Sequence, residues 1–576
     1  MAGDKPWPQV PVGNKEYNSA GVVIIGAGIS GLCTAIDLLT RNRCQNFIIL
    51  EKSAGLGGTW RDNKYPGCCC DVWSHLYSYS FEQNPAWTRE YPGQEEILEY
   101  LLGVAHKYEL YRYIRFNSAV EEARWDEIEN KWKVDVEVQG GKDAEFGSHY
   151  TITSDFLVSA VGQLNVPRLP DIEGLESFKG KIMHSARWDW SYDLTGKKAA
   201  IIGNGATAAQ IIPEIAPTLG HLTIHQRTAN WVIPRLDAAI PSWKRSLYRY
   251  LPYVRHRKRA DMMDYREAFY DAVTDNSSAF AQMLEDAHRQ LCAAQLPGPE
   301  REELRRKLEP GYKVGCKRVI ISDDYFPVFM RENVALETGG IERISERGVV
   351  VEGKGEEEVD LIILATGFRT VEFMHPIRIV GKGGRTLEEV WKEGGQALYG
   401  VSVEAMPNFG MLYGPNTNLG HNSIILMIEA QSKYINGLIS EVLEARTVGK
   451  TLAITPRDAR LAEFNEEIQT ELNASSFADP NCNSWYKRKD NGKITQNWSR
   501  NVIDYQKILS KIDWSDYDLE GSGAEKLKGD KAGSKQLGRV VEETVVSYQT
   551  MGLTALGIAA VGVGALLRNS GRLRLR

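Results

Sequence analysis

A glycine-rich stretch near the N-terminus has the spacing of a dinucleotide-binding turn. In GAGISG, Gly26, Gly28 and Gly31 follow the short apolar run GVVII and precede a helical pattern. The first glycine permits a tight turn, the second lets the backbone approach a pyrophosphate, and the third lets helix and strand pack closely. Glu51 ends the next apolar run, where a carboxylate accepts hydrogen bonds from ribose hydroxyls. We therefore predict a dinucleotide with free ribose hydroxyls at this site.

A second glycine-rich stretch, GNGATA, has different residues at the following strand end. Gly203, Gly205 and Ala208 occupy the motif positions, and the next apolar run ends at Arg227 and Thr228 instead of an acid. A guanidinium and a hydroxyl suit a ribose 2′-phosphate, which predicts NADPH; the alternative for Arg227 is a surface ion pair. The predicted contacts are Asn204, Gly205, Ala206, Thr207, Ala208, Arg227 and Thr228.

Two dinucleotide sites in one chain indicate electron transfer between two cofactors, with FAD in the first site and NADPH in the second. The fold class is α/β, with two Rossmann-like dinucleotide-binding domains. The stretch VDLIILATGF at 359–368 is predicted to return to the FAD domain as a strand, so that the FAD domain is discontinuous. The predicted segments are an N-terminal extension (1–19), the first segment of the FAD domain (20–165), an NADPH domain (166–359) with a helical insertion (240–310), the second segment of the FAD domain (360–515), a polar linker (516–543) and a hydrophobic C-terminal helix (544–567).

Composition narrows the functional classes. With 576 residues, 43% hydrophobic and 25% charged, the chain is long enough for two or three domains. A net charge of −6 gives no indication of a nucleic-acid partner. The eight cysteines form no CxxC pair, zinc-type cluster or disulfide framework, so we expect no metal site and a reducing compartment. The polar, Pro-rich N-terminus does not resemble a signal peptide.

The C-terminal segment is the candidate membrane element. From Thr544 to Leu567 no residue is charged, and the basic stretch RNSGRLRLR follows. As a helix at ~1.5 Å per residue, this segment would span roughly 36 Å, enough for a bilayer core. A membrane anchor would leave the catalytic domain facing the cytoplasm. The alternatives are a Gly/Ala-rich helix packed on a cytoplasmic body and an unstructured tail.

Further motifs resemble type I Baeyer–Villiger monooxygenases. FKGKIMHSARWD at 178–189 is similar to the fingerprint of that family and stands just before the second glycine-rich stretch. Related hydroxylating flavin monooxygenases usually end this stretch differently, so Trp188-Asp189 favours the Baeyer–Villiger branch. The stretches GGTWRDNKYPGCCCD, GCKR, ATGF and GPNTNLGHNS also fall where the family has equivalents. The resemblance covers residues 20–510 and is closest to phenylacetone, steroid and 4-hydroxyacetophenone monooxygenases.

This resemblance implies that NADPH reduces FAD and that a flavin C4a-peroxide inserts oxygen beside a ketone carbonyl, giving an ester or lactone. Arg318 would stabilise two anions, the flavin peroxide and the tetrahedral adduct that it forms with the ketone, because a guanidinium stays protonated at any working pH. Asp71 would pair with Arg318 and fix its orientation. Lys317 would join Arg227 at the 2′-phosphate. The alternatives are a basic surface dipeptide for Lys317-Arg318 and a helix N-cap for Asp71.

The resemblance also assigns the cofactor contacts. Ser423 is a candidate N-cap of a helix whose dipole would face the flavin. Cys70 is assigned to the NADP site, and the three adjacent cysteines 68–70 are interpreted as packing residues. The expected FAD contacts are Gly26, Gly28, Gly31, Glu51, Thr59, Trp60, Arg61, Asp62, Asn63, Asp71, Val72 and Tyr77.

Three functions stay open at this stage. The first is Baeyer–Villiger oxidation of a lipophilic ketone, steroid-like or from secondary metabolism. The second is a flavin monooxygenase that hydroxylates N, S or C centres. The third is a non-catalytic, membrane-tethered redox sensor. The complete second nucleotide motif and Arg318 favour the enzymes, and Trp188-Asp189 favours the first of them.

Overall fold

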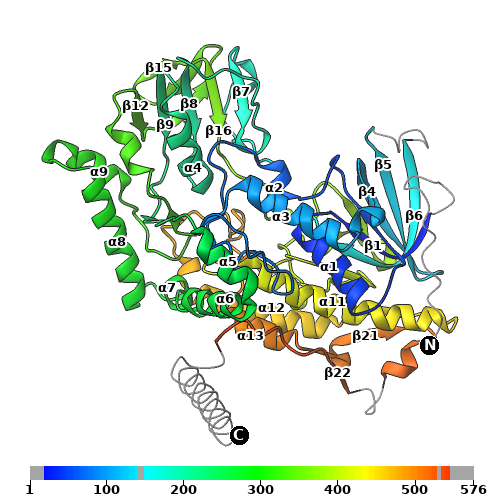
Figure 1. Cartoon of the computed structure of the whole chain (residues 1–576). Helices are drawn as coiled ribbons and strands as arrows, with labels where there is room; N and C mark the ends of the chain where they lie inside the picture. Colours follow the sequence, from blue (N-terminus) through cyan, green and yellow to red (C-terminus); the bar gives the residue numbers. More distant parts are fainter. Residues whose placement is uncertain (1–17, 141–147, 529–532, 545–576) are drawn as a thin grey trace, which may run out of the picture.

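Two large sheets, one mixed and one parallel, lie in separate regions of the molecule (Figure 1). The computed structural model describes residues 18–140, 148–528 and 533–544. The first sheet has the strand order β17-β4-β5-β6-β1-β2-β3, with β18 beside β6. The second sheet has the order β12-β9-β8-β16-β7.

The elements have the following bounds. The first sheet contains β1 (Ser19–Ile25), β2 (Phe47–Leu50), β3 (Ile114–Arg115), β4 (Ser118–Asp126), β5 (Lys131–Val138), β6 (His149–Ser159), β17 (Arg378–Val380) and β18 (Phe409–Met411). The second contains β7 (Lys181–His184), β8 (Lys198–Ile202), β9 (His221–His225), β12 (Val334–Glu337) and β16 (Leu361–Leu364). The smaller sheets contain β10 (Val232–Ile233), β11 (Ile320–Ile321), β13 (Ile341–Ile344), β14 (Gly348–Val351), β15 (Gly355–Glu358), β19 (Ala453–Pro456), β20 (Lys511–Asp513), β21 (Tyr517–Glu520) and β22 (Ser534–Gln536). The helices are α1 (Ile29–Thr40), α2 (Thr59–Asp62), α3 (Gln94–Lys107), α4 (Ala206–Ile215), α5 (Ser242–Tyr250), α6 (Pro252–Glu267), α7 (Tyr270–Thr274), α8 (Ala279–Gln295), α9 (Glu302–Leu308), α10 (Leu387–Val390), α11 (Ile424–Thr447), α12 (Asp458–Asn473) and α13 (Val502–Ile508).

The first sheet is assembled from two distant stretches of the chain. Strand β1 is buried along Ala20–Ile25 and pairs in parallel with β2 and β6, as expected for a strand covered on both faces. Strands β17 and β18 come from beyond residue 377 and pair with β4 and β6. Helix α11 packs beside α1, where Ser432 donates a hydrogen bond of 2.7 Å to Asp37. The two elements that flank the dinucleotide turn, β1 and α1, are therefore supported by residues from both stretches of the chain.

The strand predicted to return to the FAD domain lies elsewhere. Strand β16 pairs with β8 and β7, so it belongs to the second sheet and the domain boundary predicted at 359/360 is wrong. A short, fully apolar run shows that a strand is buried but not which sheet buries it. The predicted insertion at 240–310 contains helices α5 to α9, which extend from the second sheet along one side of the molecule (Figure 1).

The segment 516–543, predicted to be a linker, instead packs on the body where it is described. Strand β21 pairs with β19, and β22 pairs with β20. Four apolar residues of this segment are buried: Tyr517, Leu519, Ala524 and Leu527. Charged residues stand between them in the sequence, so the average composition of the segment does not indicate their burial. Within the described ranges, no helix is both long and apolar enough to cross a membrane. The predicted membrane segment 544–567 lies, except for Thr544, outside the described residues.

A buried ion pair joins the end of the described chain to α6. Arg259 is 1% exposed, and its Nε lies 2.5 Å from Oε2 of Glu542, whose side chain is 5% exposed. Arg259 also donates to the carbonyl oxygen of His75 at 2.6 Å. Because this pair is out of water, each charge depends on the other.

Replacing Arg259 with methionine should therefore destabilise the holoenzyme by about 3–5 kcal/mol, since Glu542 would be left buried and unpaired. Urea denaturation followed by flavin fluorescence measures this change. The matched control is Lys107→Met, which removes an exposed pair with Glu82 and should cost at most about 1 kcal/mol. Equal losses in the two variants would contradict the assignment.

Candidate active site

The first glycine-rich turn requires its glycines. Gly26 has a φ of +105°, and a Cβ on Gly31 would overlap the carbonyl oxygen of Gly26. Gly28 is the N-cap residue of helix α1 and provides no side-chain cap, so no side chain blocks the first N–H groups of the helix. Glu51 is buried at the end of β2 and accepts hydrogen bonds from the N–H groups of Ala27 and Ser53, both at 2.8 Å. Burial raises the pKa of Glu51.

The second turn has the same construction. Gly203 has a φ of +108°, and a Cβ there would stand 2.5 Å from the carbonyl oxygen of Ala365. Gly205 is the N-cap residue of helix α4, again without a side-chain cap, and a Cβ on Gly205 would meet nothing within 4 Å. Asn204 donates to the carbonyl oxygen of Thr228 at 2.9 Å. Open space before an uncapped helix N-terminus fits a pyrophosphate.

Two cations lie at the edge of the second site. Burial, and then the positive charge of Arg227, lowers the pKa of Lys317 to about 8. The Lys317 ammonium lies 4.6 Å from the centre of the Tyr312 ring. Two cations that repel each other fit a dianionic phosphate, whose binding would relieve that repulsion.

Asp71 and Arg318 form a two-point ion pair although 247 residues separate them in the chain. Nε of Arg318 donates to Oδ2 of Asp71, and Nη2 donates to Oδ1 at 2.8 Å. Nη1 of Arg318 donates to the carbonyl oxygen of Leu419 at 3.2 Å. Burial by itself would raise the pKa of Asp71, but the Arg318 guanidinium outweighs it, so that pKa lies below its ordinary value. The same pairing outweighs burial at Arg318 and raises its pKa.

The stretch between the first turn and Asp71 folds around short helix α2. Trp60 is buried and donates from its indole to the Tyr77 hydroxyl at 3.1 Å. Asn63 donates to the carbonyl oxygen of Thr59 at 3.0 Å, and Asp62 accepts a hydrogen bond from Asn165. Two other expected FAD contacts belong to the same stretch. The guanidinium of Arg61 lies against Gly55, and Val72, which follows Asp71 in the sequence, is buried.

Several residues near the pair could not be found from the sequence. Arg266, on the last turn of α6, donates to the carbonyl oxygen of Asp71 at 2.9 Å. Burial raises the pKa values of the phenols of Tyr413 and Tyr486, and the Arg318 charge lowers them to some extent. None of these residues stands in a motif. Only the fold brings them to Asp71.

A disulfide joins Cys316 to Cys482, although we predicted no disulfide framework. Cys316 stands two positions before Arg318, and Cys482 lies in the loop after α12. The bond ties the loop that carries Lys317 and Arg318 to the C-terminal segment of the first domain. A spacing of 166 residues follows no cysteine pattern and could not be read from the sequence.

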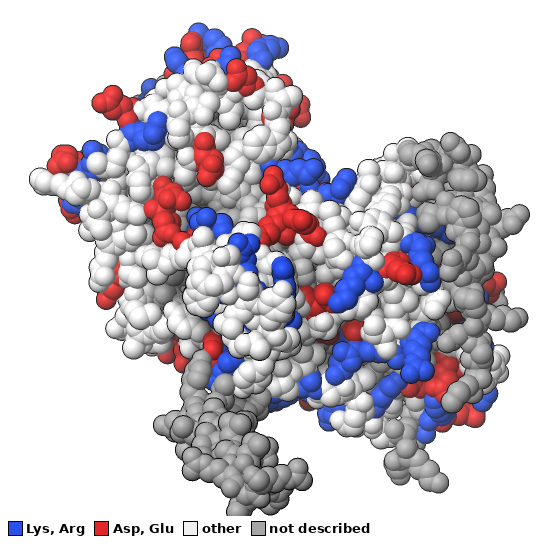
Figure 2. Space-filling view, in the orientation of Figure 1, with Lys and Arg blue, Asp and Glu red and all other residues white. Residues whose placement is uncertain are grey.

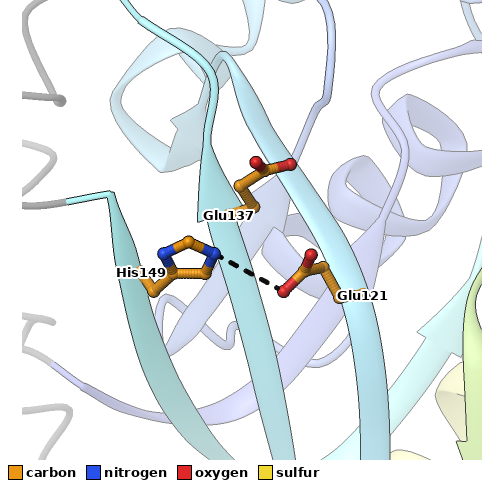
Figure 3. Close-up of side chains that lie close together, drawn as sticks. All are labelled: Glu121, Glu137 and His149. Carbon is orange, nitrogen blue, oxygen red and sulfur yellow. Dashed lines mark ion pairs between the residues drawn. The ribbon is translucent and has the colours of Figure 1, made fainter.

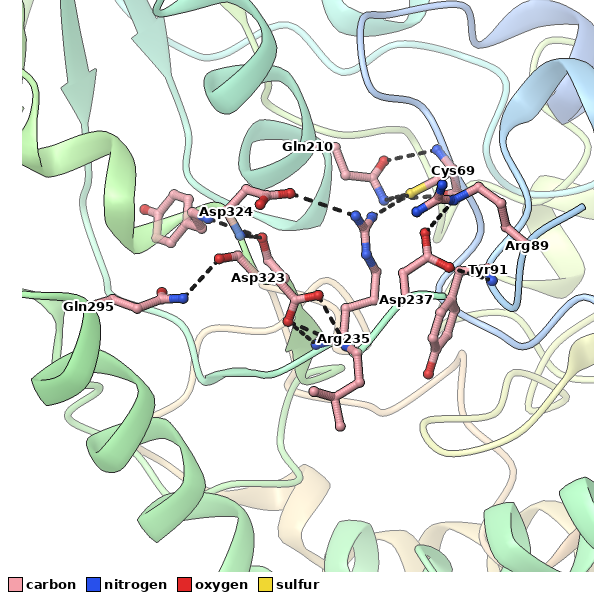
Figure 4. A network of polar contacts seen from close by, with 12 residues as sticks. Cys69, Arg89, Tyr91, Gln210, Arg235, Asp237, Gln295, Asp323 and Asp324 are labelled. Carbon is pink, nitrogen blue, oxygen red and sulfur yellow. Dashed lines mark hydrogen bonds and ion pairs between the residues drawn. The ribbon is translucent and has the colours of Figure 1, made fainter. Parts of the chain in front are cut away.

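A polar network joins the cysteine stretch to the second domain (Figure 4). Gln210 on α4 accepts from the Tyr65 hydroxyl at 2.9 Å and donates to the carbonyl oxygen of Cys69 at 3.1 Å. Arg235 lies 3.2 Å from the Cys69 sulfur and 3.7 Å from a carboxylate oxygen of Asp324. Cys69 stands two residues before Asp71, and Gln210 lies on the helix that follows the second nucleotide turn. These contacts therefore fix the position of the second turn relative to the stretch that carries Asp71. The next residue, Cys70, is buried in the hydrophobic core that also contains residues of β1 and α11, and its assignment to the NADP site stays a prediction.

The third helix N-terminus near this centre belongs to α11. Ser423 stands at its N-cap position, as predicted, but its side chain makes no capping bond. The Ser423 Oγ is buried and, within the described residues, has no hydrogen-bond partner. Together, the uncapped α1, α4 and α11 fit two nucleotides and the electron-rich end of a flavin.

One group of side chains has ligand atoms close enough to hold a metal in the described portion of the chain. It consists of Glu121, Glu137 and His149 on strands β4, β5 and β6 (Figure 3). The closest ion pair within it joins His149 Nε2 and Glu121 Oε2 at 3.8 Å. Two carboxylates and one imidazole at the surface are common without a metal, and we assign none here.

Comparison with known proteins decides the family. The family model described as flavin-binding monooxygenase-like matches residues 19–250. The FAD-binding monooxygenase ktnD of Aspergillus niger is 51% identical, over 96% of this chain and 90% of that relative. A Baeyer–Villiger monooxygenase of Streptomyces coelicolor is 38% identical, over 86% of this chain and 92% of the relative. The chain belongs to the Baeyer–Villiger monooxygenases.

Solved structures agree with this assignment. Oxidized steroid monooxygenase bound to NADP has a TM-score of 0.72 and 30% identity, over 85% of this chain and 97% of that one. OTEMO in complex with FAD and NADP has a TM-score of 0.75 and 26% identity, over 87% and 99%. The predicted family, the two Rossmann-type domains, and the use of FAD and NADPH are thereby confirmed. This monooxygenase is an NADPH-dependent oxidoreductase that carries out Baeyer–Villiger oxidation.

Proposed function

We propose that Asp71 and Arg318 form the catalytic centre of this monooxygenase and that its substrate is a lipophilic ketone. The observation that carries the proposal is the two-point contact between the carboxylate and the guanidinium. Bound FAD supplies the activated oxygen, and NADPH supplies the electrons that reduce the flavin. The chain itself must bind both, hold the ketone, and stabilise the negative charge that develops on the carbonyl oxygen.

Arg318 has free hydrogen-bonding capacity for that oxygen. A guanidinium has five N–H groups, and three of them are directed to Asp71 and Leu419. The remaining two can donate to an oxygen that becomes negative as the carbonyl is attacked. Asp71 keeps the plane of the guanidinium fixed, so the donors need no reorientation during the reaction. Arg318 is the charge-stabilising group and Asp71 its positioning partner.

The residues of both nucleotide turns are proposed to bind the cofactors in the order the sequence predicts. The α1 turn and the α2 stretch would hold FAD, with Glu51 and Asp62 beside it. The α4 turn would hold NADPH, whose 2′-phosphate would meet Arg227, Thr228 and Lys317. Support comes from the uncapped helix starts and from the paired cations.

This assignment gives kcat/KM for NADPH a defined pH dependence. In the free enzyme Lys317 loses its proton near pH 8, so its attraction for the phosphate is present below that pH and lost above it. We expect kcat/KM for NADPH to fall as pH rises through about 8. Lys317→Gln should lower the value at neutral pH and remove the fall. With NADH, which has no 2′-phosphate, the wild-type profile should lack this step. An identical step with both nucleotides would contradict the role of Lys317.

A ketone panel tests the proposed reaction. NADPH consumption is followed with aliphatic, alicyclic, steroid and terpenoid ketones, and the products are examined by mass spectrometry for a mass gain of one oxygen as ester or lactone. The similarity to a steroid monooxygenase and to cyclohexanone monooxygenase with bound epsilon-caprolactone supports carbonyl substrates of this kind. Turnover of amines or thioethers with no ester from any ketone would contradict the proposal.

We also propose that segment 544–567 anchors the enzyme in a membrane, with the body on the cytoplasmic side. Its uncharged composition and length support this. The full chain should stay with membranes after alkaline carbonate extraction, whereas a chain that ends at Thr544 should be released. Release of both would contradict the anchor and favour the cytoplasmic alternative.

A further inference from the structure

The surface formed by α5 and α6 combines exposed aromatic side chains with positive charge. From Ala238 to Ala260 the chain has no Asp or Glu and has these basic residues: Lys244, Arg245, Arg249, Arg255, Arg257, Lys258 and Arg259. Trp243, Tyr250 and Tyr253 are 63%, 76% and 63% exposed. In Figure 2, white and blue atoms cover α5. Exposed aromatic rings beside Lys and Arg are typical of elements that lie in a bilayer interface.

The exposed residues of α5 share one helix face. Trp243, Ser246 and Tyr250 follow a spacing of three and four, which places them in one row, and all three are exposed. Tyr248 lies on the opposite face, is buried, and packs against the His75 ring at 4.8 Å. Helix α5 is therefore held by one side and presents the other, aromatic side to its surroundings.

The positive charge of this face is not balanced locally. Among the described residues, Lys244 and Arg249 form no ion pair, and the ammonium of Lys244 lies 5.7 Å from the Trp243 ring centre. In contrast, Arg257 pairs with Asp261 and Arg259 pairs with Glu542. Lys244 and Arg249 are thus available to anionic groups outside the protein.

The described chain ends on the same side of the molecule. In α6, Tyr253, His256, Ala260 and Asp264 follow a helical spacing and form one row. At the end of this row, the N–H of Thr544 donates to Asp264 at 3.1 Å. Residues 545–567, which follow directly, contain no charge, and the basic stretch RNSGRLRLR comes next. The uncharged segment that follows Thr544 therefore begins at the same face of α6 that carries the exposed Tyr253.

We propose that the face of α5 and α6 around Trp243, Lys244, Arg249, Tyr250 and Tyr253 docks on an anionic lipid bilayer. The aromatic rings enter the headgroup region, and the basic side chains contact acidic headgroups. The surface acts in addition to the proposed C-terminal anchor and sets how the body lies on the membrane.

Docking through this face would bring the catalytic pair near the lipid. Helix α6 leads from Tyr253 to Arg266, which contacts the backbone of Asp71. A ketone dissolved in the bilayer would then be one helix length from the centre, about 24 Å for the sixteen residues of α6. This step rests on the proposed lipophilic substrate, whereas the docking itself does not.

Quenching by brominated lipid tests the proposal with the full-length holoenzyme. Phosphatidylcholine vesicles with or without about 30% phosphatidylserine contain dibrominated acyl chains, which quench tryptophans that enter the interface. The wild type is compared with Trp243→Tyr and with the matched control Trp190→Tyr, since Trp190 is 65% exposed elsewhere on the surface. Binding is measured separately by vesicle flotation, and Lys244→Gln/Arg249→Gln tests the charge contribution.

We expect quenching that is strongest with phosphatidylserine, that is lost in Trp243→Tyr and that is kept in Trp190→Tyr. The double charge variant should reduce binding to the acidic vesicles by on the order of 30-fold, since each basic side chain contributes about fivefold at an anionic surface. Vesicle binding without quenching of Trp243 would overturn the docking face and leave the C-terminal anchor standing. No vesicle binding would overturn both. A dimer in light scattering that Trp243→Tyr dissociates would assign the face to a second copy of the chain and overturn the proposal.

Discussion

Replacing Arg318 with alanine should lower ester formation by at least about 10²–10³-fold, while NADPH still reduces the bound flavin. The guanidinium is the permanent cation that Asp71 orients, and its two remaining N–H groups are the donors proposed for the developing oxyanion. Reduction of the flavin needs the two nucleotide sites but not this donor. The two half-reactions are measured separately, by anaerobic stopped-flow bleaching of the flavin and by mass spectrometry of the ester.

Two further variants separate charge from geometry. Arg318→Lys keeps a cation but loses the planar fork, so its ester yield should be low although above that of Arg318→Ala. Asp71→Asn keeps two hydrogen-bonding atoms but removes the charge that fixes the guanidinium, and it should uncouple NADPH consumption from ester formation. Arg385→Ala, which removes an exposed pair with Glu404, is the matched control and should behave as wild type. Undiminished ester yield in Arg318→Ala would refute the assignment of Arg318 to the oxyanion.

Local physics accounts for those site residues that the sequence predicted. The glycines of both turns are predictable because backbone dihedrals and helix–strand contact restrict those positions to residues without a side chain, and both effects act within a few residues. The cation at Arg227 follows from the chemistry of a 2′-phosphate at a strand end, whereas Lys317 was predicted through the resemblance. The Asp71–Arg318 pair was predicted only through resemblance, since no local pattern connects residues 247 positions apart.

The errors also have physical causes. Strand β16 is as apolar as a strand of either sheet, and its partners β7 and β8 are chosen by packing that the run itself does not encode. The segment 516–543 has few apolar residues, but four of them, Tyr517, Leu519, Ala524 and Leu527, are buried, and β21 pairs with β19. Arg266, Gln210 and Cys482 reach the site through tertiary contacts alone. The spacing of residues in the sequence predicts the structure of one helix or strand, whereas these contacts form only when several helices and strands pack together.

Replacing Gly31 with valine should give a colourless protein that has lost its FAD. A side chain at this position would collide with the carbonyl oxygen of Gly26, so α1 would have to move away from β1. The uncapped N–H groups at the start of α1 would then no longer meet a pyrophosphate, and flavin occupancy should fall by more than about tenfold. The ratio of flavin to protein absorbance measures the occupancy, and retention on a 2′,5′-ADP resin shows whether the second domain is still folded. Gly103→Val is the matched control, because a Cβ on Gly103 meets nothing within 4 Å, and it should keep its flavin. A fully yellow Gly31→Val protein would mean that FAD does not depend on the close approach of α1 and β1.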